Sequence, residues 1–116
     1  MDLWTELLEL ANALDEAIRD MRKTGRELAE AERDYKVCLR SYALRLKGMK
    51  GFAVGLIQLV VKGEPEVADA RMRRDIAQTM YDASREVVMA TKLKLRVVNE
   101  QISREISNPH VGRGDL

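Results

Sequence analysis

Apolar residues recur at steps of three and four along the first third of the chain. The column begins at Leu3 and continues to Tyr42, with one seven-residue gap around Thr24 and Gly25. This spacing is that of a helix, and it is sustained over about six heptads. It predicts a helix over about residues 2–47. Because a helix of that length cannot bury its own apolar face, it must pack along another long element.

The apolar column drifts around this first helix. The heptad column that contains Leu3 and Leu10 weakens toward Arg45, whereas the neighbouring column from Trp4 to Leu46 stays apolar. Such drift is typical of a straight helix with 3.6 residues per turn, and it favours bundle packing over a supercoiled rod. The glycine at position 25 either marks a kink or a close helix crossing, or is a tolerated surface residue.

Glycines and prolines divide the remainder of the chain. Gly48 and Gly51 end the first helix. Residues 52–61 are apolar on every side, which fits a short buried helix or a strand. Since the chain offers no second strand, we favour the helix. Pro65 suits the first turn of a second long helix over about 65–107.

These elements predict an all-α fold. We expect an antiparallel hairpin of two long helices with a short apolar helix at the hinge. The hairpin would form one domain over residues 1–107, followed by a flexible tail over 108–116.

The second long helix carries two apolar columns. One column, from Val67 to Ile102, suits packing against the first helix. The other is left over and predicts an interface with a second copy, in a homodimer or a higher oligomer. Its members are Ile76, Met80, Ala83, Val87, Ala90 and Val97.

Composition agrees with long helices, because 34% of the residues are charged and only 4% are aromatic. The charges are unevenly distributed. Residues 1–20 hold six acids and one base, whereas residues 21–50 hold nine bases and four acids. An antiparallel hairpin would place the acidic start beside the basic end of the second helix, leaving the hinge end electropositive.

The basic hinge end is the strongest functional signal. Arginine and lysine clustered beside an apolar segment suit a phosphate-bearing ligand, nucleic acid or an acidic protein surface. The alternative is a solvated rim in which neighbouring acids pair with these bases. The candidate anion-binding residues are Arg45, Lys47, Lys50, Arg71, Arg73 and Arg74. Phe52 and Tyr81 are candidates for stacking on a base.

Other chemistry is not indicated. One histidine and one cysteine cannot build a metal site, no cofactor motif is present, and no residue set suggests catalysis. Cys38 lies on the apolar column, where a buried structural thiol is expected. Nucleic-acid binding is disfavoured because helix-turn-helix and zinc-finger signatures are absent. The single cysteine, the acidic start and the lack of a span-length apolar segment predict a cytoplasmic protein.

Several segments resemble short coiled-coil proteins of tailed phages and prophages of Gram-positive bacteria. They are ALDEAI (residues 13–18), AEAERDYKVCLR (29–40), GEPEVADARMRRDIAQTMYDA (63–83) and LKLRVVNEQISREI (93–106). The resemblance implies a phage origin, a helical hairpin and a place in the cytoplasm of the host bacterium. It implies no activity and no site residues.

The leading hypothesis is a non-enzymatic protein that acts by stoichiometric binding. In its most concrete form it is a counter-defence protein that sequesters a host nucleotide signal or inhibits a host immune protein. Two alternatives remain open: an accessory protein of phage DNA replication or recombination, and a purely structural assembly protein.

Overall fold

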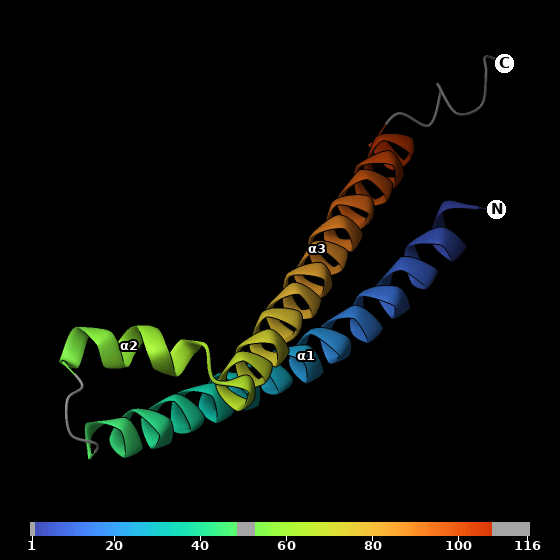
Figure 1. Cartoon of the computed structure of the whole chain (residues 1–116). Coiled ribbons are helices and arrows are strands. Elements are labelled where there is room, and N and C mark those ends of the chain that lie inside the picture. Colours follow the sequence, from blue (N-terminus) through green and yellow to red (C-terminus); the bar gives the residue numbers. More distant parts are fainter. Residues whose placement is uncertain (1, 49–52, 108–116) are drawn as a thin grey trace, which may run out of the picture. The chain divides into compact units, whose positions relative to one another are not determined.

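The chain forms three helices in a computed structural model that describes residues 2–48 and 53–107. They are α1 (Leu3–Lys47), α2 (Val54–Lys62) and α3 (Pro65–Ser107), and the described residues contain no strand (Figure 1). The all-α prediction is confirmed.

The predicted element boundaries are close to those observed. Both long helices begin and end within one residue of their expected positions. The apolar segment whose sequence fits either a helix or a strand forms the helix α2. The tail predicted to be flexible lies outside the described residues.

The chain divides into two compact bodies, each of which contains part of both long helices. The terminal body combines Met1–Arg22 with Ala83–Leu116, and the central body is Lys23–Asp82. The single domain expected over residues 1–107 stays a prediction.

The terminal body is an antiparallel pair of helix segments. At one end, Ser84 Oγ donates a hydrogen bond to Asp20 Oδ2 over 3.0 Å. Further along, Leu10 of α1 and Val98 of α3 line one groove, so residue numbers fall along α1 as they rise along α3. The side chains buried in this body are Ala17, Ser84, Val88, Thr91, Val98 and Ile102. This buried set is small and includes two polar residues, as expected of only two packed helices.

A side-chain cap marks the start of α1. The backbone N–H of Thr5 donates to Asp2 Oδ1 over 2.8 Å, which satisfies one of the free amides of the first turn. This hydrogen bond also lowers the pKa of the Asp2 carboxyl. The predicted beginning of the helix therefore coincides with a physical cap.

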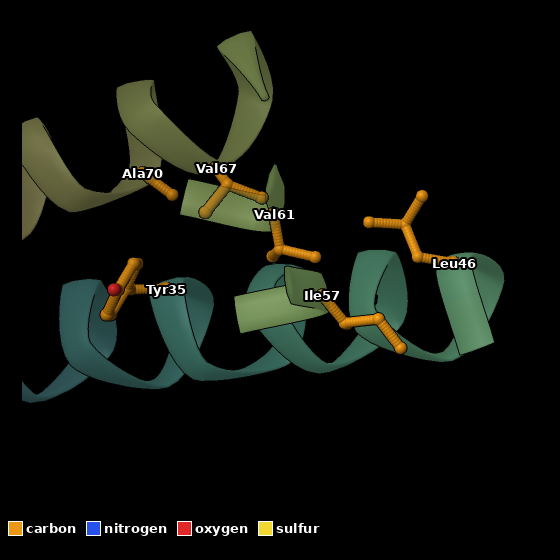
Figure 2. Close-up of a cluster of buried hydrophobic side chains, with 6 residues drawn as sticks. All are labelled: Tyr35, Leu46, Ile57, Val61, Val67 and Ala70. Atoms are coloured by element: carbon orange, nitrogen blue, oxygen red, sulfur yellow. The ribbon is translucent and has the colours of Figure 1, made fainter. Parts of the chain in front are cut away.

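The central body has a core built from all three helices (Figure 2). Its buried side chains are Tyr35 and Leu46 of α1, Ile57 and Val61 of α2, and Val67 and Ala70 of α3. Val61 and Val67 are the large side chains that lose essentially all contact with solvent. Because α2 supplies one of them, its inner face is an integral part of this core.

A two-residue link joins α2 to α3. Gly63 N–H donates to the Val60 carbonyl and Glu64 N–H donates to the Val61 carbonyl, each over 3.1 Å. Pro65 then opens α3, where its missing N–H costs no helical hydrogen bond. The short link fixes where α3 begins relative to α2.

The interruption of the apolar column at residues 24–25 is a close helix contact. Thr24 is buried. A Cβ atom placed on Gly25 would lie 3.2 Å from Cε1 of Tyr81, inside ordinary contact distance. Of the interpretations left open by the sequence, the structure supports the close crossing.

Candidate interaction site

The predicted anion-binding residues of the central body separate into two groups. The Arg74 guanidinium lies 4.5 Å from the centroid of the Tyr35 ring, and Arg45 lies 4.9 Å from that of Tyr42. Tyr35 and Tyr42 are two turns apart on α1, which is about 10 Å. Arg74 and Arg45 therefore lie about two turns apart along α1 and do not converge on one phosphate group.

The arginine group on α3 is partly neutralised by acids. Arg74 Nη2 lies 2.9 Å from Asp75 Oδ1, and this hydrogen-bonded ion pair raises the pKa of Arg74. Glu32 acts in the same direction. Arg71 is half-buried and Arg73 is exposed. For Arg74, these contacts favour the solvated, paired rim over a free anion ligand.

A second acid of α3, Glu66, lies about two turns before Arg74. Glu66 hydrogen bonds with the hydroxyl group of Tyr42, and this contact is the main reason that the pKa of Tyr42 is raised. Burial and the negative charge of Glu66 add to the effect. The beginning of α3 is thus a place where positive and negative groups alternate.

The predicted stacking residues offer no base platform among the described residues. Tyr81 is half-buried with its ring against Gly25. Phe52 and the anion candidate Lys50 lie outside the described residues.

The outer face of α2 is a feature that sequence reasoning did not single out as a site. The helix buries Ile57 and Val61, yet Val54, Leu56 and Leu59 remain 75%, 46% and 73% exposed. Leu59 is two positions from each of the two buried residues, about 200° of rotation away, so it points to the opposite side. The signal was present, because the segment is apolar on every side.

The stretch of sequence over residues 35–63, which includes α2, carries charges of one sign, and the acidic residue Glu64 directly follows it. Between residues 35 and 63 the chain has six basic residues and no acidic residue. Lys47 follows the core residue Leu46 at the end of α1, Lys62 ends α2, and both are exposed. We call the set Val54, Leu56, Leu59, Lys47 and Lys62 the α2 surface.

A shallow groove of about 450 Å³ lies elsewhere in the central body, where α1 meets the start of α3. Cys38 lines it and is half-buried rather than fully buried, although it packs against the core as predicted. The other lining residues are Arg33, Asp34, Val37, Ser41, Tyr42, Arg45 and Glu66. Its mixed charges give no preference for an anion.

The two apolar columns of α3 differ in their exposure to solvent. Members of the first, such as Val67, Val88 and Ile102, are buried or half-buried. The second is exposed throughout: Ile76 55%, Met80 54%, Val87 55% and Val97 47%, with Ala83 and Ala90 also exposed. The chain itself leaves this column uncovered, and its use as an interface stays a prediction.

Within residues 2–48 and 53–107, no cluster of three or more histidine, cysteine or carboxylate side chains could hold a metal ion. No helix in these ranges combines the length and the apolar character that crossing a membrane demands. No family model, no curated protein and no solved structure matches the chain.

Proposed function

We propose that this protein is a non-enzymatic, stoichiometric binder that recognises an acidic protein surface through the α2 surface. The observation that carries the proposal is the exposure of Leu56 and Leu59 on a helix whose other face is fully used by the core. An exposed apolar face that the fold does not need, on a helix that ends in a basic residue, suits a protein-interaction site.

The charge distribution selects the kind of partner. Lys47 and Lys62 would steer an acidic surface toward the patch and set its orientation, while the leucines supply the buried area. A free nucleotide needs several donors converging on its phosphates. The separation of Arg74 from Arg45, and the pairing of Arg74 with Asp75, support a protein partner over a nucleotide.

Inhibition of a host immune protein is therefore the form of the counter-defence hypothesis that we favour. An accessory role in phage DNA metabolism is the second candidate, since the same lysines would also attract phosphates. It predicts binding to DNA that weakens steeply with salt.

The experiment compares charge-reversed variants as bait in lysates of a Gram-positive host. The test variant is Lys47→Glu with Lys62→Glu. The control is Lys23→Glu with Arg26→Glu, which reverses two exposed charges elsewhere on the central body. We expect one acidic protein, at a fixed ratio to the bait, with the wild type and the control. The test variant should bind the purified partner about tenfold more weakly.

A second variant tests the apolar part of the surface. Leu59→Ser should also weaken binding while leaving the helix content unchanged. If the test variant and Leu59→Ser both retain the same partner with unchanged affinity, the α2 surface is not the recognition site.

A further inference from the structure

The terminal body has a groove that the proposed function does not use. It measures about 720 Å³ and lies between α1 and α3. Its apolar lining comes from Leu10, Ala13, Leu93, Val97 and Val98, and its polar lining from Glu6, Glu9, Lys94 and Gln101. An amphipathic helix commonly binds in a groove of this kind, which has an apolar floor and runs along two helices.

The α3 edge of this groove continues as an exposed apolar flank. Ala83, Val87, Ala90, Leu93 and Val97 follow one another at steps of three and four, and all five are exposed. The buried residues of α3 in this body occupy a different side of the helix. The flank is therefore a second packing face that its own chain leaves open.

We infer that the terminal body forms a two-fold dimer in which α3 of a second copy lies antiparallel against this flank and in this groove. A two-fold axis at Ala90 places Ala90 opposite Ala90 of the second copy. Ala83 then faces Val97, and Val87 faces Leu93. The central alanines allow the helices to approach closely, and apolar residues face each other on both sides of them.

The charges on either side of Ala90 favour this register. With the axis at Ala90, Glu86 lies opposite Lys94 of the second copy, and by symmetry the pair occurs twice. A parallel arrangement in the same register would place like charges opposite each other. Glu86 and Lys94 are both exposed, so they are accessible to a second copy.

The area available is adequate for a stable dimer. One side of the terminal body is about 30 Å long and about 20 Å wide, or roughly 600 Å² in projection. A stable interface buries roughly 800 Å² of accessible surface per partner, and accessible surface exceeds projected area. A second layer of helices would also complete the small two-helix core of this body.

Sedimentation velocity and native mass spectrometry test the dimer. We expect the wild type to sediment at twice the chain mass of 13.2 kDa. Ala90→Glu should give a monomer with unchanged helix content, because residue 90 is exposed in the single chain. Asn99→Glu is the control, since it adds the same charge to another exposed side of α3 and should leave the dimer intact.

A charge exchange tests the orientation. Glu86→Lys and Lys94→Glu should each raise the dimer dissociation constant by about tenfold, because each turns two attractive pairs into repulsive ones. The double variant should restore it.

A wild type that stays monomeric at high concentration would overturn the inference, as would a dimer that survives Ala90→Glu. A monomer whose groove instead binds a different protein would overturn it too. The inference uses residues of the terminal body only, so it and the proposed function can fail separately.

Discussion

The packing of the inner face of α2 on the core can be tested by shortening the side chain of Val61. This side chain is fully buried, so Val61→Ala removes two methyl-sized groups from water-free surroundings. The lost transfer free energy is about 1.6 kcal/mol. The incompletely filled cavity adds to this, giving an expected loss of about 2–3 kcal/mol in the free energy of unfolding. Leu59→Ala, on the outer face of the same helix, should cost less than about 0.5 kcal/mol.

Urea unfolding followed by circular dichroism measures both variants. The comparison is well controlled, because both substitutions introduce alanine into the same helix two positions apart. If Leu59→Ala lowers the free energy of unfolding as much as Val61→Ala does, the side of α2 that carries Leu59 also packs against the core. The α2 surface would then lose its basis. If neither variant changes stability, α2 is not docked on the core.

Two further predictions concern pairs within the central body. Gly25→Ala should gain less than the roughly 1 kcal/mol expected from helix propensity, because the ring of Tyr81 must move, whereas in a Tyr81→Ala background the full gain should appear. Equal gains in the two backgrounds, measured by urea unfolding, would contradict the close contact. Because folding raises the pKa of Tyr42, the contact of its protonated hydroxyl stabilises the fold below pH about 10. This stabilisation is lost as the pH rises through the pKa of Tyr42 in the folded state. Glu66→Ala, which removes both the acceptor and its charge, should lower the pKa of Tyr42 in a tyrosinate absorbance titration, and an unchanged titration would exclude the hydrogen bond.

The long helices were predictable because they bury one side each. On α1 the sequence places an apolar residue at nearly every step of three or four, and the few exceptions fall at Thr24 and Gly25. Even there, a buried threonine and a glycine against an aromatic ring continue the interface. Periodicity reports which residues face a neighbour, so it locates helices and their inner sides well.

The position of the basic residues was less predictable. Even a hairpin whose helices are level at the hinge separates Arg45, two residues before the end of α1, from Arg74, nine residues after the start of α3, by about 10 Å. In the structure, α2 fills the end of the core beside Leu46, and α3 begins about level with Tyr42. Arg74 therefore lies further back along α1, beside Tyr35. Sequence patterns do not give the offset between two helices when a third element separates their ends.

The outer face of α2 is, with the second apolar column of α3, a part of the sequence that the fold leaves unexplained. The core requires an apolar helix only on the side of Ile57 and Val61, and polar residues at the positions of Leu56 and Leu59 would satisfy it equally well. Leu56→Ser with Leu59→Ser should therefore leave the free energy of unfolding nearly unchanged while abolishing partner binding. Val61→Ala should lower the free energy of unfolding, and it should reduce partner binding only to the extent that it unfolds the protein. A stability loss in the serine variant comparable to that of Val61→Ala would show that these leucines serve the fold, and it would remove the argument for a binding surface.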